Sequence, residues 1–231
     1  MPEIADVIPH PTGHTPLAVL VEAAVDTIAS ATRSVAEGAG RLEACASLDV
    51  GGLTPSVELL RGCLELGVPC VAMVRPRAGD YVYADAEFER LCADASEMLS
   101  AGAHGIVFGC LRADRTIDAD GVRAVVRLAE NAQTVFHRAF DETPDAFAAL
   151  ALLIECGVTR VLTSGHAATA IEGVEEIREL VTRANGRIEI LPGGGVRAAN
   201  ARTLATTAGV TQLHARGTDA GIIAEIRAAQ P

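Results

Sequence analysis

Short apolar runs alternate with amphipathic stretches along most of the chain, and a glycine marks many of the junctions. In "ELGVPCVAMV", "ECGVTRVLTS" and "TAGVTQLHA", a helix-like stretch ends at the glycine and a run rich in apolar residues follows. Glycine commonly ends a helix because it adopts the left-handed conformation without a Cβ penalty. The same pattern recurs along the sequence at Gly38, Gly67, Gly102, Gly157, Gly186 and Gly209.

These junctions predict eight strands. The gap between Gly102 and Gly157 is about twice the usual one, and "ENAQTVFHRAF" supplies a further strand inside it. The opening "LAVLVEAAV" supplies the first. The expected strands lie near residues 18–25, 40–45, 69–75, 105–110, 134–138, 160–164, 187–191 and 211–215.

The segments between the expected strands have helical periodicity. After the fifth strand, the spacing i, i+3, i+4, i+7 holds for Phe147, Leu150, Ala151 and Ile154, and Thr143 is the expected N-cap with proline in the first turn. Eight alternating βα units predict an α/β fold of the (β/α)8, TIM-barrel-like type. A doubly wound open sheet is the alternative, but no GxGxxG motif follows the first strand.

Composition and charge narrow the class of protein. We expect one barrel domain over residues 17–231, preceded by an extended arm over residues 1–16. Hydrophobic residues make up 49% of the chain and aromatic residues only 3%, which suits helices packed on strands. No signal peptide or membrane span is recognisable, so a cytoplasmic location is the default. The net charge of −11 disfavours nucleic acid and anionic membranes as partners, but is compatible with an anionic small molecule in a locally basic pocket.

Polar and charged residues follow the expected strands, at the end where a barrel places its ligand site. In "TVFHRAFDETPD", a buried strand runs directly into His137, Arg138 and Asp141. Burying many charges without a task is costly, so we expect these groups to line one opening and to bind an anionic ligand. The other strand ends contribute Glu22, Glu43, Arg75, Asp80, Ser164, Gly165, Gly193, Gly194, His214 and Arg216.

His137 is the expected general acid or base, because an imidazole titrates near neutrality. Glu22 or Glu43 is its expected carboxylate partner, and Arg75 is expected to hold a substrate carboxylate or phosphate bidentately. A divalent metal held by Glu22, Glu43 and His137 is an alternative. A purely structural alternative is internal ion pairing, for instance of Glu43 with Arg75.

The glycines Gly193 to Gly195 after the seventh strand form a candidate phosphate or carboxylate site. Successive glycines expose backbone N–H groups, and a helix expected to begin near Ala198 adds its N-terminus. The Ser164-Gly165 turn and Arg216 are expected to flank this loop. A tight turn that needs positive φ is an equally good explanation of the glycines.

Several motifs together resemble those of a known family. "GRLEAC", "MVRPRAGDYVY", "VFHRAFDETPD", "RVLTSGHAATAIEG" and "ILPGGGV" occur in this order, and the sequence resembles the CutC family over nearly everything except the N-terminal arm. The resemblance implies a (β/α)8-type barrel, often dimeric, in the cytoplasm. It also implies a role in copper homeostasis, with cysteines as Cu(I) ligands, because thiolates and Cu(I) are both soft.

The chain departs from the family pattern at one cysteine. Cys45 corresponds to the cysteine of the family's "ELC" pattern, but Ala24 stands where the family has a cysteine on strand one. Since a two-thiolate site is not available, we expect any copper at Cys45 to bind weakly. Two main hypotheses follow: copper homeostasis, or a lyase, isomerase or hydrolase acting on a small anionic, for example phosphorylated, metabolite. A barrel that has lost its activity is a third.

Overall fold

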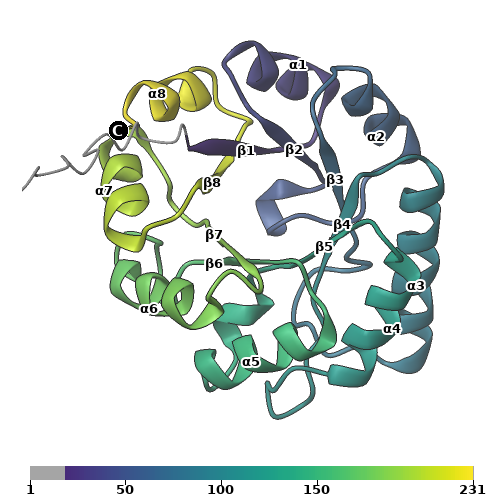
Figure 1. Cartoon of the computed structure of the whole chain (residues 1–231). Coiled ribbons are helices and arrows are strands. Elements are labelled where there is room, and N and C mark those ends of the chain that lie inside the picture. The colour runs from purple at the N-terminus through teal and green to yellow at the C-terminus, as the bar shows by residue number, and fades with distance from the viewer. Residues whose placement is uncertain (1–18, 231) are drawn as a thin grey trace, which may run out of the picture.

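The computed structural model describes residues 19–230, which form a parallel barrel surrounded by helices (Figure 1). Every ladder is parallel, and the strand order is β7-β6-β5-β4-β3-β2-β1-β8. The fold is therefore the expected (β/α)8 barrel, and the alternative of a doubly wound open sheet is wrong. The strands are β1 (Leu20–Val25), β2 (Arg41–Ala44), β3 (Cys70–Met73), β4 (Gly105–Phe108), β5 (Gln133–Phe136), β6 (Arg160–Thr163), β7 (Glu189–Pro192) and β8 (Gln212–Arg216).

The helices lie outside the strands, each following the strand of the same number (Figure 1). Two short 3-10 helices, η1 (Leu48–Val50) and η2 (Arg138–Glu142), follow β2 and β5. The α-helices are α1 (Ile28–Ala36), α2 (Val57–Leu64), α3 (Asp85–Ser100), α4 (Ala119–Ala129), α5 (Ala146–Cys156), α6 (Val174–Ala184), α7 (Ala198–Ala208) and α8 (Ile222–Ala228).

Helix α5 begins later than expected. Its N-cap is Asp145, whose carboxylate accepts hydrogen bonds from the backbone N–H groups of the first turn. Thr143 instead ends η2 and donates its hydroxyl to the Phe140 carbonyl at 2.8 Å. The buried side of α5 includes Leu150 but not Ala151, which is exposed. Because this helix is apolar on nearly every side, its sequence does not indicate which side faces the strands.

Strand side chains alternate between two hydrophobic layers, because successive residues of a strand point to opposite faces. Val21, Leu42, Ile106 and Phe136 point outward and pack under the helices. The layer inside the barrel contains aliphatic and sulfur-containing side chains: Ala24, Cys45, Leu48, Val71, Met73, Val107, Val135, Leu162 and Leu191. This inner layer fills the middle of the barrel and leaves room for polar side chains at its two ends.

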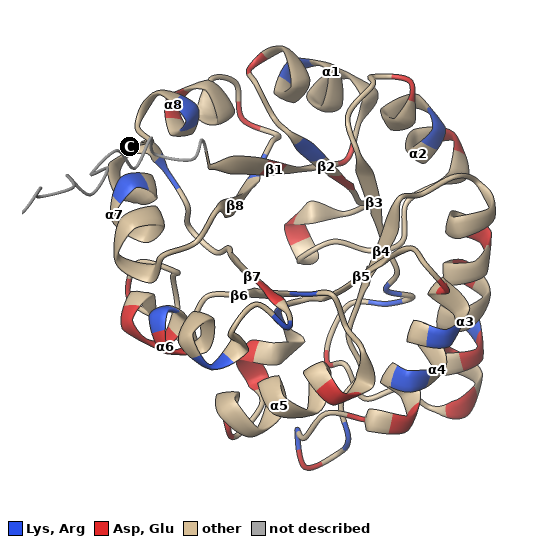
Figure 2. Ribbon diagram, viewed as in Figure 1, with Lys and Arg blue, Asp and Glu red and all other residues tan. Residues whose placement is uncertain are grey.

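Polar side chains close the N-terminal end of the barrel across its seam. Among the described residues, backbone ladders join all neighbouring strands except β7 and β8. Gln212 of β8 donates to Glu189 of β7 at 3.1 Å, and Glu189 also pairs with Arg160 at 2.7 Å. Arg41 donates to Gln212 at 2.7 Å and pairs with Glu22. Figure 2 shows basic positions on β2 and β6, and many further charges on the outer helices.

Two further expectations concern the N-terminal arm and membrane-spanning helices. The expected arm over residues 1–16 lies outside the described residues. Between residues 19 and 230, no helix is both long enough and apolar enough to cross a bilayer.

Candidate functional site

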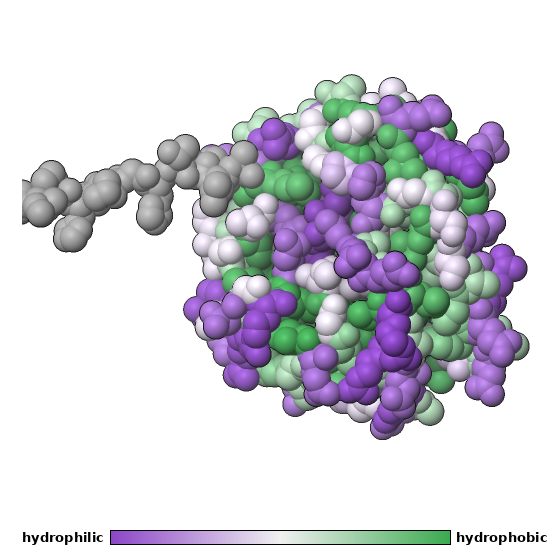
Figure 3. All heavy atoms as spheres, turned by 45° about the vertical axis from the view of Figure 1, so that its right-hand side comes forward, coloured by the Kyte–Doolittle hydropathy of each residue, from purple (hydrophilic) through white to green (hydrophobic). Residues whose placement is uncertain are grey.

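A cavity of about 760 Å³ opens at the C-terminal ends of the strands. Figure 3 shows hydrophilic side chains gathered over the middle of the molecular face. The cavity is lined by residues from strand ends that lie far apart in the sequence, and these include Glu43, Arg75, His137, Arg138, Asp141, Gly194, His214 and Arg216. The barrel therefore brings more than half of the predicted site residues to one opening.

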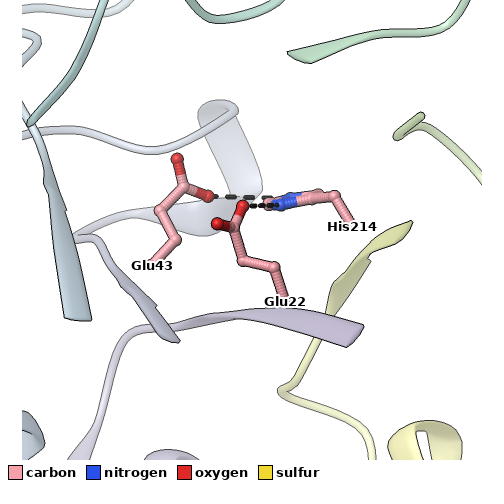
Figure 4. A group of neighbouring side chains, drawn as sticks. All are labelled: Glu22, Glu43 and His214. Atoms are coloured by element: carbon pink, nitrogen blue, oxygen red, sulfur yellow. Dashed lines mark hydrogen bonds and ion pairs between the residues drawn. The ribbon is translucent and has the colours of Figure 1, made fainter. Parts of the chain in front are cut away.

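At the base of this cavity, His214 lies between two buried carboxylates (Figure 4). The register of β1 with β8 places Glu22 beside His214, and His214 Nδ1 is 2.8 Å from Glu22 Oε1. His214 Nε2 is 3.6 Å from Glu43 Oε2. The two glutamates are almost completely buried, whereas His214 is partly exposed to the cavity. These three side chains form the carboxylate–imidazole group of the site.

The charges in this group are strongly coupled. Burial alone would raise the pKa of Glu22, but Arg41 and the bonded His214 outweigh it and lower this pKa to about 2. Burial raises the pKa of Glu43 to about 7, opposed by His214 and supported by the charge of Glu22. Burial would lower the pKa of His214, but the hydrogen bond to Glu22 and both carboxylate charges raise it overall. The group can therefore accept or release a proton near neutral pH.

His137 does not have the near-neutral pKa that we expected. Its Nδ1 accepts the Ala139 N–H at 3.1 Å, and burial together with the nearby Arg75 charge lowers its pKa to about 3. The expected metal-ligand set is also corrected, because the described residues that approach to within 4.8 Å of one another are Glu22, Glu43 and His214. His214 takes this place because β8 is the neighbour of β1, whereas β5 is not.

Arg75 holds loops rather than offering a free guanidinium fork. Its Nη1 donates to Val50 O at 2.9 Å and to Gly52 O at 3.3 Å, and its Nη2 donates to Gly79 O at 2.7 Å. Arg75 is therefore engaged by backbone carbonyls through both terminal nitrogens, and it forms no ion pair with Glu43 among the described residues. The ion pairs Arg41–Glu22 and Arg160–Glu189 lie instead toward the N-terminal end of the barrel.

Three other arginines supply positive charge at the cavity. Arg138 is held by Asp141 and by the Ser164 hydroxyl, both at 2.8 Å, and remains 41% exposed. Arg216 donates to Leu48 O at 3.0 Å and lines the cavity. Arg197 also lines the cavity and was not predicted, although it lies only two residues after the predicted glycine loop. Asp141 and the buried Ser164 thus act as supports that fix Arg138.

The glycine loop has two different tasks. Gly194 lines the cavity with a φ of +96°, and a Cβ there would lie 3.2 Å from Arg138 Nη1. At Gly193, a Cβ would lie 2.5 Å from Leu162 and 3.3 Å from His214, so this glycine makes room for both side chains. Helix α7 begins at Ala198, as expected.

Gly165 and Asp80 lie outside the cavity lining, as do the predicted residues Glu22, Cys45, Ser164 and Gly193. Gly165 has a φ of +70° and forms a tight turn against the backbone of Gly173. Asp80 pairs with Arg77 at 3.0 Å and is 53% exposed. Neither residue contacts the cavity, which is lined by other parts of the same loops.

Cys45 is fully buried beneath the cavity. Burial and the charges of Glu43 and Glu22 hold the pKa of its thiol well above its ordinary value. The side chain of Met73 is nearby: Cys45 Sγ and Met73 Cε lie 3.4 and 3.3 Å from the point where a Cβ of Gly52 would stand. The partner of Cys45 in a sulfur-ligand site would therefore be Met73, with Ala24 supplying no ligand on β1.

We predict that Glu43→Gln changes how stability depends on pH. Folding raises the pKa of the Glu43 carboxyl from 4.5 to about 7. The contribution of Glu43 to stability is therefore fully present below pH 4.5 and is lost as the pH rises through about 7. The variant should therefore gain stability relative to the native chain between pH 5 and pH 8, by on the order of 1–3 kcal/mol. Chemical unfolding of both proteins at each pH measures this difference; a constant difference would contradict the raised pKa.

The fold and its mouth define a class of protein: a (β/α)8 barrel with an ionisable ligand cavity at the C-terminal ends of its strands. The model of the CutC family matches residues 19–219, and the chain belongs to this family. The resemblance seen in the sequence motifs is confirmed.

Individual relatives agree with this assignment. A CutC family protein of Treponema denticola is 44% identical over 197 residues, which cover 85% of this chain and 80% of that protein. The human copper homeostasis protein cutC homolog is 39% identical over 196 residues, with coverage of 84% and 72%. A crystal structure of CutC from Streptococcus agalactiae has a TM-score of 0.82 at 32% identity, and the match covers 87% of this chain and all of that one.

Proposed function

We propose that the chain is an enzyme that acts on a small anionic molecule by acid–base chemistry at the mouth of the barrel. The observation that carries this proposal is the carboxylate–imidazole group, which opens into a cavity large enough for a metabolite. A cytoplasmic location and a dimer, both implied by the resemblance to CutC, belong to the same proposal.

His214 and Glu43 are the proposed proton-transferring groups. Glu22 holds His214 by Nδ1, so that Nε2 faces Glu43. Arg41 keeps Glu22 charged and in place. A carboxyl whose pKa lies near 7 beside an imidazolium can supply or take up a proton at the pH of the cell.

The cationic side chains around the cavity favour an anionic substrate. Arg138, Arg197 and Arg216 line it, although the whole chain carries a net charge of −11. Guanidinium groups bind carboxylates and phosphates by charge-assisted hydrogen bonds. Although Asp141, Glu142 and Asp219 also line the cavity, these guanidinium groups can bind an anion there and support an anion site.

The basic residues also limit the type of reaction. All 19 lysine and arginine positions of the sequence are arginine. Catalysis through an imine requires a lysine amine, so this sequence does not supply it. Proton transfer in a lyase, isomerase or hydrolase reaction remains the mechanism that the residues support.

A panel of small carboxylates and phosphate esters tests this proposal. Each compound is incubated with the native protein, and its conversion is followed by NMR. We expect conversion of at least one anionic compound, with a rate that depends on a group titrating near pH 7. Conversion that is independent of pH between 5 and 9 would contradict the assigned acid–base group.

Copper binding is a second candidate function. It is favoured by the name of the human relative, a copper homeostasis protein, and by the proximity of Cys45 and Met73, whose thiolate and thioether are soft ligands that suit Cu(I). The donor types fit copper, but the raised thiol pKa opposes it, because the thiolate is the form that binds metals. We therefore expect Cu(I) to bind only weakly, beneath the cavity at Cys45 and Met73.

Cu(I) titration under reducing conditions tests the copper candidate. The native protein is compared with Cys45→Ser and Met73→Leu, and Cys92→Ser is the control because this cysteine is only partly buried and lies on α3. We expect at least about tenfold weaker binding in each of the first two variants, since each removes one of two ligands. Equal affinity in all four proteins would contradict copper binding at Cys45.

A further inference from the structure

Three nitrogen atoms of cavity-lining residues are buried without a hydrogen-bond partner in the described part of the chain; one is Nδ1 of His166, and the other two follow strands β3 and β5. These two are Nε2 of His137 and Nε of Arg75, and both residues are 4% exposed and line the cavity. Buried polar groups in folded proteins are nearly always satisfied, so each exception calls for an explanation. A ligand oxygen is the partner that this location suggests.

The geometry decides which nitrogen of His137 carries the proton. Nδ1 accepts the backbone N–H of Ala139 at 3.1 Å, so in the neutral imidazole the hydrogen is on Nε2. The ring is fixed in this orientation by its surroundings. A Cβ on Gly109 would lie 2.6 Å from Nδ1, and the Tyr81 ring packs 4.7 Å from the imidazole.

The two unpartnered nitrogens that follow β3 and β5 belong to residues that contact the same aromatic ring. The Arg75 guanidinium carbon lies 4.8 Å from the Tyr81 centroid, on which the His137 ring also packs. The terminal nitrogens of Arg75 are occupied by the carbonyls of Val50, Gly52 and Gly79. Arg75 thus provides a fixed positive charge, and its Nε–H has no partner among the described residues and is available to a ligand.

His137 stays neutral beside this charge. Burial and Arg75 lower its pKa to about 3, so it remains a neutral Nε2–H donor near neutral pH. A neutral imidazole donor next to a fixed guanidinium can stabilise negative charge that develops on an oxygen, because neither group has to reorganise. His137 therefore differs in role from His214, which exchanges protons.

We propose that His137 Nε2–H and Arg75 Nε–H form a subsite for one oxyanion oxygen of the ligand, a carboxylate or phosphate oxygen or a carbonyl oxygen that becomes negative during proton transfer. The subsite comes from β3 and β5, whereas the carboxylate–imidazole group comes from β1, β2 and β8. This inference rests on the proposed function for its role in turnover, but not for the binding of an oxyanion.

Side-chain nitrogen NMR tests the subsite without any turnover. The spectrum of ¹⁵N-labelled protein is recorded from pH 5 to pH 8, and the His137 signals are assigned by their loss in His137→Phe. We expect a protonated Nε2 and an unprotonated Nδ1 at every pH. Sodium acetate, as a minimal oxyanion, should shift the Nε2–H signal saturably, while sodium chloride at equal ionic strength should not. A signal unmoved by acetate, or a His137 that titrates near pH 6.5, would overturn the proposal.

Variants then separate the lost donor from lost folding. His137→Phe keeps an aromatic ring but removes the donor, and His137→Gln keeps a side-chain N–H. Acetate binding, followed by calorimetry, should be about tenfold weaker or more in the first variant and largely restored in the second. His104→Gln, an exposed site outside the cavity lining, is the matched control. If His137→Phe melts like the native protein and binds acetate equally well, the subsite is absent. If it does not fold, the His137 signals are assigned by their loss in His137→Gln, and the acetate-induced shift in the native protein still decides.

Discussion

Arg41→Met is expected to lower the free energy of unfolding by about 3–5 kcal/mol, because it removes the guanidinium from the buried Glu22 carboxylate and leaves His214 as its remaining partner. The two side chains are 6% and 1% exposed and form an ion pair at the base of the barrel. Arg41 also donates to Gln212 at 2.7 Å, so the substitution weakens the polar network across the β7–β8 seam. Chemical denaturation measures this loss of unfolding free energy. It is carried out at pH 8, where the Glu22 carboxylate is charged and the missing guanidinium costs most.

A double variant is the control for this prediction. In Arg41→Met combined with Glu22→Gln, no buried charge of the pair remains, so much of the lost stability should return. The loss in the single variant should also shrink at low pH, since Glu22 can then be protonated. A loss below about 1 kcal/mol at pH 8 would mean that this pair does not hold the barrel together.

His214→Asn is expected to reduce the turnover of the substrate identified in the panel by about 10²–10⁴-fold, the usual contribution of a general acid or base. Asparagine can still donate to Glu22, as His214 Nδ1 does at 2.8 Å, but it has no Nε2 to exchange a proton with Glu43. The loss should therefore appear in kcat more than in KM. Steady-state kinetics measures both.

His104→Asn is the matched control for this second prediction. This histidine lies outside the cavity lining and accepts the Cys70 N–H at 3.1 Å. Its variant should turn over substrate like the native protein. If His214→Asn keeps more than about half of the native kcat, proton transfer through His214 is contradicted, whichever compound is the substrate.

The strands could be predicted because most of the helices end before a glycine that has a positive φ. Gly157 and Gly209 are such residues, with φ values of +84° and +70° after α5 and α7. The gathering of strand-end residues at one mouth could be predicted too, since parallel strands of a closed barrel share one end. His137, Glu43 and His214 all reached the cavity for this reason.

The pairing of these residues could not be predicted, because it depends on the register between strands far apart in the chain. Glu22 and His214 are 192 positions apart and become neighbours only where β8 pairs with β1. Arg75 shows a second reason. Its guanidinium donates to backbone carbonyls of two loops, and the conformations of these loops leave no pattern of hydrophobic and polar residues in the sequence.

The titration of Glu43 and His214 tests the central claim that the barrel mouth holds a proton-exchanging carboxylate–imidazole group. In protein labelled with ¹³C in the glutamate carboxyls and ¹⁵N in the imidazoles, Glu43 is assigned by its loss in Glu43→Gln and followed from pH 3 to pH 9. The account predicts that Glu43 titrates near pH 7 while His214 carries protons on both nitrogens at pH 6. A Glu43 that titrates near 4.5, together with a neutral His214 at pH 6, would contradict it.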